Sequence, residues 1–255
     1  MRLQNYGIKV ASDSEYVEKI MSIQTTGNTR QKYAFADLNQ TIIERIVDIQ
    51  LEPETVDCLW QQLKEITLSE TEQTVLNYII NGVVNERLSI MNEATLWARL
   101  NYPLLQLAET EQIHAWSEIS INANLQHVTL HGVIDGVLGY TLAGMLQMPW
   151  LVIVEAKKGL GNKDPRYQLY GQILATAFLN QQSQLEKVTA TETSTRILYG
   201  CYTVADDWTF VRARITSLET SRPEMKLAFS REYAGRLEAQ TILEILKTIT
   251  ENYSI

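Results

Sequence analysis

The feature that most constrains the fold of this chain is an abrupt change of hydrophobic period near residue 116. Apolar and polar side chains alternate through residues 116–125, and the alternation returns in residues 127–138. A period of two is typical of half-buried β-strands, and the short polar segment between the two stretches predicts a hairpin. Residues 150–157 (WLVIVEAK) are almost continuously apolar. They predict a third strand, buried on both faces of a sheet.

A helix is expected to follow the third strand. Asp164–Pro165 is a favourable pair for the N-cap and first position of a helix, and residues 165–180 are apolar on nearly every side. Two further strands are expected at residues 195–203 and 208–215, joined by a turn at Asp206–Asp207. A strand–helix–strand crossover within an antiparallel set predicts a mixed α/β sheet.

The regions on either side of these strands are predicted to be helical. Two Ser-x-x-Glu capping boxes, Ser12–Glu15 and Ser69–Glu72, indicate helix starts. An apolar stripe formed by Leu38, Ile42, Ile46 and Ile49 predicts another helix, and the last helix is expected from about residue 230 to residue 253. The expected organisation has three parts: an α-helical N-terminal region (1–85), a core (86–220) and a C-terminal helix packed on the core (221–255).

Composition excludes several classes of protein. No apolar run reaches the roughly 18–20 residues of a membrane span, and the N-terminus lacks the apolar stretch of a signal peptide, so we expect a cytoplasmic protein with no membrane partner. The two cysteines are too far apart in sequence to indicate a disulfide framework or a zinc knuckle. With 22 Lys and Arg against 30 Asp and Glu, the net charge is −8. Nucleic acid would therefore have to be held by a local basic patch or by metal ions.

Three charged residues at the strand ends are the best candidates for chemistry. Asp135 lies toward the end of the second strand, and Glu155 and Lys157 lie two residues apart toward the end of the third, on one face. If these strands pair, the two carboxylates converge on one hard cation such as Mg²⁺ or Mn²⁺, with the amine beside them. Such a site is suited to phosphodiester hydrolysis. A solvent-facing ion pair at the sheet edge is the alternative.

The spacing of these residues resembles a known signature. Asp135, separated by nineteen residues from Glu155-Ala156-Lys157, resembles the PD-(D/E)XK motif of restriction-endonuclease-like nucleases. The helix that begins DPRYQLYGQILA is similar to the Q-x-x-x-Y helix of the RecB-like and Cas4-like branch. Gln168 matches the glutamine of that helix, but Gln172 stands where the pattern has tyrosine. The segment YGCYTVADDWTFVRA is similar to the hairpin that follows in many of these enzymes.

The resemblance covers about residues 115–215 and implies a fold, an activity and a set of site residues. The fold would be an αβββαβ core with a mixed sheet, an α-helical N-terminal elaboration and a C-terminal helix. The activity would be that of a metal-dependent nuclease, with DNA as the expected substrate because most enzymes with this signature cut DNA. The implied roles are a metal held by Asp135, Glu155 and the Ala156 carbonyl, a further ligand from Glu93 or Glu118, Lys157 serving the attacking water, and Gln168 supporting the site.

A basic cluster follows the third strand. Lys158, Lys163 and Arg166 are candidates for contacts with the phosphate backbone, although such a run is more often a solvated turn. Two other functions stay open: a catalytically inactive nuclease-fold binding module, and a subunit of a larger DNA-processing complex. In the latter case the N-terminal helices are expected to bind a protein partner or a second copy of the chain.

Overall fold

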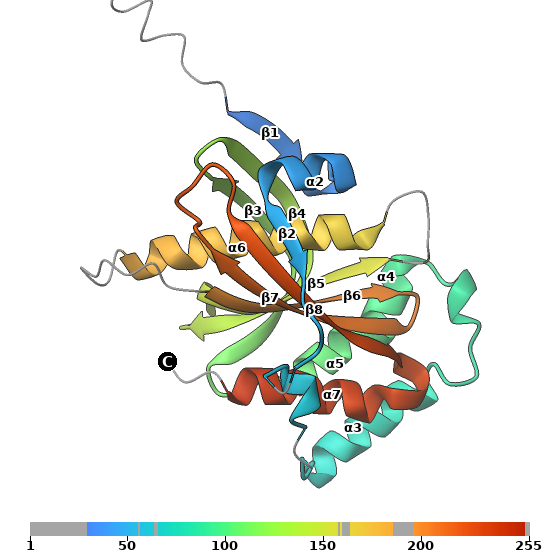
Figure 1. Cartoon of the computed structure of the whole chain (residues 1–255). Coiled ribbons are helices and arrows are strands. Elements are labelled where there is room, and N and C mark those ends of the chain that lie inside the picture. The colour runs from blue at the N-terminus through green and yellow to red at the C-terminus, as the bar shows by residue number, and fades with distance from the viewer. Residues whose placement is uncertain are drawn as a thin grey trace, which may run out of the picture.

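The computed structural model describes residues 30–55, 57–63, 66–157, 159, 164–185 and 196–252, and it shows a mixed α/β protein with an eight-stranded sheet (Figure 1). The strands are β1 (Gln31–Ala34), β2 (Asp48–Leu51), β3 (Ile113–Asn124), β4 (Val128–Leu142), β5 (Met145–Lys157), β6 (Arg196–Val204), β7 (Asp207–Thr216) and β8 (Glu224–Ala234). The α-helices are α2 (Gln40–Ile46), α3 (Glu70–Asn81), α4 (Glu93–Leu96), α5 (Tyr102–Leu107), α6 (Pro165–Leu185) and α7 (Gly235–Glu251). Shorter helical turns are η1 (Phe35–Asp37), η2 (Leu59–Gln61), η3 (Leu88–Ile90) and the π-helical η4 (Trp97–Asn101).

The order of strands in the sheet is β1-β4-β5-β6-β7-β8-β2, and β3 pairs with β4 beside this path. Neighbours from β3 to β5 and from β6 to β8 are antiparallel, whereas β5 and β6 are parallel. Helix α6 supplies the crossover that this parallel pair requires. The mixed α/β sheet predicted from the sequence is confirmed.

The predicted elements of the core are present with shifted ends. The three strands expected at 116–125, 127–138 and 150–157 correspond to β3, β4 and β5, and each is longer than predicted. Helix α6 begins at Pro165, and the Asp164 carboxylate accepts the Arg166 backbone N–H at 3.0 Å, as an N-cap does. The turn between β6 and β7 lies at residues 205–206, one position earlier than predicted.

Two predictions for the flanking regions are wrong. Residues 1–85 are not purely helical, because β1 and β2 enter the sheet, and the stripe that was expected to continue to Ile49 ends with α2 at Ile46. The C-terminal helix does not begin near residue 230, because β8 continues to Ala234 before α7 starts. In both cases pairing between strands determines the conformation: β1 pairs with β4, and β8 pairs with β7 on one side and β2 on the other. The Ser12–Glu15 capping box lies outside the described residues.

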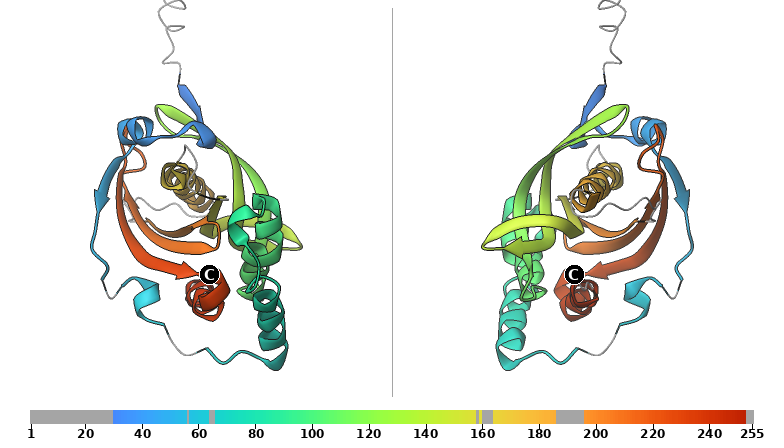
Figure 2. Two further views of the ribbon diagram at one scale, coloured as in Figure 1. Left: turned by 90° about the vertical axis from the view of Figure 1, so that its right-hand side faces the viewer. Right: turned by 90° about the vertical axis from the view of Figure 1, so that its left-hand side faces the viewer.

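Helices cover the sheet on both faces and give it two hydrophobic cores. The sheet curves around α6, which packs with η1 and α2 on the concave face (Figure 2). A Cβ added at Gly171 of α6 would lie 2.1 Å from Leu38 Cδ1, so α6 and the segment after η1 approach closely. Helices α3, α5 and α7 form the second core against the other face. Among the described residues, no helix is long and apolar enough to cross a membrane.

Candidate active site

The candidate site lies where one edge of β4 changes partner. Strand β3 pairs along β4 from Thr129 to Tyr140 and so occupies one edge. On the other edge, β1 pairs with residues 128–131 and β5 pairs from Gly136 onward. The four residues 132–135 therefore face a fork between β1 and β5. Asp135 is the last residue of this fork.

The Asp135 carboxylate joins the two strands where their ladder ends. Its Oδ2 accepts the backbone N–H of Ala156 at 2.8 Å. Beyond Val154, strand β5 keeps its pairing with β6 but has no further pair with β4, so this N–H would otherwise lack a partner on the β4 side. One side chain thus fixes the position of the Glu155-Ala156-Lys157 segment relative to β4.

Glu155 is fully enclosed beneath α6. Its side chain is 0% exposed, and its Oε1 contacts the Lys157 amine at 2.5 Å. Its Oε2 accepts hydrogen bonds from Gln168 at 2.8 Å and from Gln172 at 2.6 Å. The two glutamines are one helical turn apart on α6, so both reach the same oxygen. Gln172, at the position where the sequence departs from the Q-x-x-x-Y pattern, is thus a second donor to this carboxylate.

The surroundings of these groups shift their protonation. Burial, and after it the neighbouring Asp135 carboxylate, raises the pKa of Glu155 to about 7. Burial likewise raises the pKa of Asp135, and the Ala156 N–H and the Lys157 charge offset part of that effect. Burial acts to lower the pKa of Lys157, but the charge and hydrogen bond of Glu155 together with the charges of Asp135 and Glu93 outweigh it and raise that pKa. The three groups therefore form one electrostatic cluster.

A small hollow of about 150 Å³ opens beside Asp135, on the side of α4. It is lined by the carboxylate residues Glu93, Glu118 and Asp135 and by Ala156, with no basic residue among its lining residues. Glu118 has a φ of 55°, a left-handed conformation that costs roughly 1–2 kcal/mol for a residue with a Cβ. This backbone lies directly across from Asp135, between the Ser117–Gly136 and Ile119–Ile134 pairs.

Two residues that the sequence analysis did not single out support Asp135 from β3 and η4. Trp97 Nε1 donates to Ser117 Oγ at 3.0 Å, and Ser117 Oγ donates to the Asp135 carbonyl at 3.1 Å. A Cβ at Gly136 would lie 2.5 Å from the Trp97 ring, so only glycine permits this close contact. Neither contact leaves a periodic signal in the sequence, because the residues come from different elements.

The donor set fits a hard cation in its chemistry, since it consists of carboxylate oxygens around a hollow without a positive charge. As the side chains stand, no three His, Cys, Asp or Glu residues within the described ranges are close enough together to hold a metal ion. Binding a cation there would require carboxylate side chains to rotate into the hollow.

Of the three residues in the predicted basic cluster, the structure describes Arg166. Lys158 and Lys163 lie outside the described residues. Arg166 is at the start of α6, where its guanidinium forms an ion pair with Asp164 at 2.5 Å. The structure therefore places Arg166 beside the N-cap of α6.

Comparison with models of protein families gives no match for this chain, and comparison with curated proteins gives none either.

Proposed function

We propose that this protein is a metal-dependent nuclease of the PD-(D/E)XK type, with the αβββαβ core of restriction-endonuclease-like enzymes. The observation that carries the proposal is the link between Asp135 and the Glu155-Ala156-Lys157 segment, made by the 2.8 Å hydrogen bond to the Ala156 N–H. The resemblance of the sequence supplies the family, and the donor set at the fork between β1 and β5 agrees with it.

Each residue of the cluster has a role in this proposal. Asp135, Glu155 and the Ala156 carbonyl would hold Mg²⁺ or Mn²⁺, with Glu93 or Glu118 as a further ligand. A bound divalent ion supplies Lewis acidity toward a phosphoryl oxygen and lowers the pKa of a water. Lys157, kept protonated by the acids around it, orients the attacking water and offsets negative charge in the transition state. Gln168 and Gln172 fix the Glu155 carboxylate.

DNA is the substrate that we propose, on the strength of the resemblance. The chain has a net charge of −8, so its affinity for DNA would depend on local features such as Arg166 and on bound metal ions.

A cleavage assay with plasmid DNA and Mn²⁺ tests the proposal. Lys157→Ala is expected to lower the cleavage rate at least about 100-fold, the loss usually seen when a transition-state charge loses its partner. Lys32→Ala is the matched control, because Lys32 is exposed on β1, and it should cut as the wild type does. Equal cutting by Lys157→Ala would contradict the assigned site.

Calorimetric titration with Mn²⁺ gives a second readout that does not depend on cleavage. Asp135→Asn should abolish the binding heat while the far-ultraviolet circular dichroism spectrum stays unchanged. Heat of binding that survives both Asp135→Asn and Glu155→Gln would place the cation elsewhere.

The full enclosure of Glu155 favours a second candidate function. A carboxylate that is 0% exposed, with both oxygens already engaged, is also what a catalytically inactive nuclease-fold binding module would contain. Such a module, alone or as a subunit of a DNA-processing complex, would bind DNA without cutting it. Wild-type DNA binding with no cleavage in Mg²⁺ or Mn²⁺, and no heat on Mn²⁺ titration, would select this alternative.

A further inference from the structure

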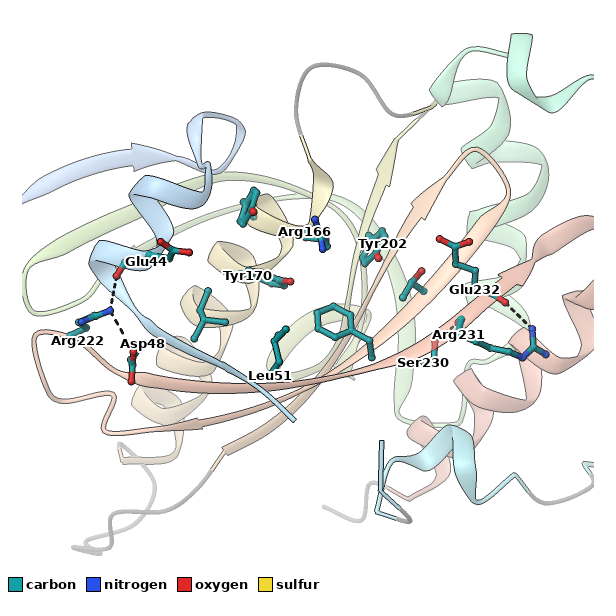
Figure 3. Close-up of a pocket in the computed structure, with 14 residues that line it drawn as sticks. Glu44, Asp48, Leu51, Arg166, Tyr170, Tyr202, Arg222, Ser230, Arg231 and Glu232 are labelled. Carbon is teal, nitrogen blue, oxygen red and sulfur yellow. Dashed lines mark hydrogen bonds and ion pairs between the residues drawn. The ribbon is translucent and has the colours of Figure 1, made fainter. Parts of the chain in front are cut away.

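A second cavity, of about 830 Å³, lies on the concave face of the sheet (Figure 3). The sheet curves around α6, and the helix packs on β5 and β6 (Figure 2). Residues of α6, β6, β8 and β2 line the cavity. Its size is in the range of small-ligand pockets, about 300–1,000 Å³, which suits unpaired bases and is too small for a stacked duplex.

The cavity lies on the α6 face of the sheet, beside the strand pair that carries Glu155. Tyr202, one of its lining residues, lies opposite Glu155 in the parallel β5–β6 register, and residues opposite each other project from the same face of a sheet. Arg166 also lines the cavity, two residues before Gln168 on α6. Figure 3 shows Arg166 between Tyr170 and Tyr202. The cavity therefore lies on the face of the sheet from which Glu155 and Lys157 project, although neither of them is among its lining residues.

Aromatic rings dominate the part of the cavity nearest α6. Tyr167 and Tyr170 are in edge-to-face contact, with ring centroids 6.0 Å apart, and Tyr170 contacts Phe229 of β8 in the same manner at 6.4 Å. With Tyr202, four rings from α6, β6 and β8 line one cavity. Aromatic side chains along a groove are the platforms on which unpaired bases stack, whatever their sequence.

The charges of the lining are balanced. Three arginines and three acidic residues line the cavity, and each arginine has a carboxylate partner: Arg166 with Asp164, Arg222 with Asp48 at 3.4 Å, and Arg231 with Glu238 at 2.6 Å. A densely charged ligand would have to displace these acids from the arginines. A neutral planar group meets no such competition. The lining is thus suited to nucleobases, with phosphates left at the margin.

We infer that this cavity, defined by Tyr167, Tyr170, Tyr202 and Phe229, holds unpaired bases of the nucleic acid that is cut at the neighbouring site. The inference rests on the proposed function and specifies its substrate: a single strand, or a single-stranded end of a duplex. A continuous duplex is a poor ligand for the cavity.

Fluorescence anisotropy with a labelled single-stranded oligonucleotide, in Ca²⁺ to prevent cleavage, tests the inference. Tyr202→Leu and Tyr167→Leu should each weaken binding about tenfold, the usual effect of removing one stacking partner. Tyr78→Leu is the matched control, because Tyr78 is 80% exposed on α3, and it should bind as the wild type does. The duplex of the same sequence should bind more weakly and should be insensitive to all three substitutions.

A second measurement uses the wild-type protein alone and so does not depend on the folding of any variant. A single strand that contains 2-aminopurine should lose fluorescence on binding, because the base stacks on aromatic rings. Unchanged fluorescence at saturation, or equal loss of affinity for strand and duplex in Tyr202→Leu, would overturn the inference.

The two proposals fail separately. If Lys157→Ala abolishes cleavage while Tyr202→Leu and Tyr167→Leu bind and cut single strands as the wild type does, the cavity has no role and the nuclease stands. If nothing is cut but single-strand binding depends on Tyr202, the cavity proposal stands and the nuclease does not.

Discussion

Two parts of the sheet bury charged side chains, but one part disfavours the charged form of a carboxylate and the other stabilises it. On the α6 face, burial and the nearby Asp135 raise the pKa of Glu155 to about 7. On the other face, Arg212 of β7 is 1% exposed and pairs with Asp57 and, at 3.1 Å, with Glu52. The hydrogen bond from Arg212 holds the pKa of Asp57 far below its ordinary value.

The difference separates a structural ion pair from a candidate site. At Arg212, opposite charges meet and the charged forms are stabilised, which attaches Glu52 and Asp57 to the sheet. At Glu155, two carboxylates share one amine and are buried away from water. The protonated form of Glu155 is therefore favoured, and its pKa is raised. Strongly raised pKa values with a specific charge neighbour are more typical of functional sites.

The largest effect is expected from removing the buried cation. Arg212→Ala should lower the free energy of unfolding by about 3–5 kcal/mol, because it empties a buried volume, takes the cation away from Glu52 and leaves Asp57 with the Arg214 ion pair. Urea denaturation followed by circular dichroism measures this. A loss below about 1 kcal/mol would mean that the pair does not attach Glu52 and Asp57 to the sheet.

The next effect is a dependence of stability on pH that originates at Glu155. Below its ordinary pKa of 4.5 both folded and unfolded chains carry the proton, so burial of this group has no charge penalty. Between pH 4.5 and about 7 only the folded chain keeps the proton, and stability falls as the pH rises. Above pH 7 the penalty is complete and reaches about 3 kcal/mol.

Glu155→Gln should remove this slope. In EDTA, urea denaturation between pH 5 and pH 8 should show a variant that is more stable than the wild type at about pH 8 and equal to it near the ordinary pKa of a glutamate. A wild-type curve that rises over this range would contradict the raised pKa of Glu155.

A smaller effect is expected from the two glutamine donors, and it compares them directly. Gln172 is 0% exposed, whereas Gln168 is only partly buried, and both donate to Glu155 Oε2. Above pH 7, Gln172→Leu should lower the free energy of unfolding by about 1–3 kcal/mol, because the buried charge loses a donor. Gln168→Leu should lower it by less, since water reaches that position. Equal losses in urea denaturation would show that burial does not distinguish the two donors.

The smallest effect is expected at the exposed edge of the structural ion pair. Arg214 contacts Asp57 at 3.0 Å, but its side chain is 34% exposed. Arg214→Ala should change the free energy of unfolding by less than about 1 kcal/mol, as is usual for exposed pairs. This variant is also the matched control for Arg212→Ala, and a similar loss in the two would remove the distinction between buried and exposed partners.

The sequence predicts the parts of the fold whose signal is local. The buried run before Glu155 and the Asp164–Pro165 helix start depend only on neighbouring residues, and both are found as predicted. The short strands β1 and β2 have four residues each, too few to show a period. Their partners, β4 and β8, lie 97 or more residues away along the chain. Their strand conformation therefore depends on pairing within the folded sheet.

In the candidate site too, the sequence predicts the positions that depend on neighbouring residues and not those that depend on contacts between distant elements. The sequence alone brings Glu155 and Lys157 to one face, because they are two apart on a strand. The position of Asp135 relative to them depends on where β4 exchanges β1 for β5, which no local pattern encodes. The contact of Trp97 with Ser117 and the second donor at Gln172 likewise come from packing between elements.

The fork in the β4 edge separates what the fold requires of Asp135 from what the proposed chemistry requires of it. Asp135 is held by main-chain geometry and its carboxylate contacts a main-chain N–H, so the scaffold needs little from its charge. A neutral residue of the same shape at this position would leave the architecture intact and, under the proposed function, would remove a metal ligand. Extending the β4–β5 ladder by one pair would bring Asp135 into the ladder and shorten the opening to residues 132–134. Under the proposed function, one substitution would therefore remove catalysis and leave a well-folded protein available for another use.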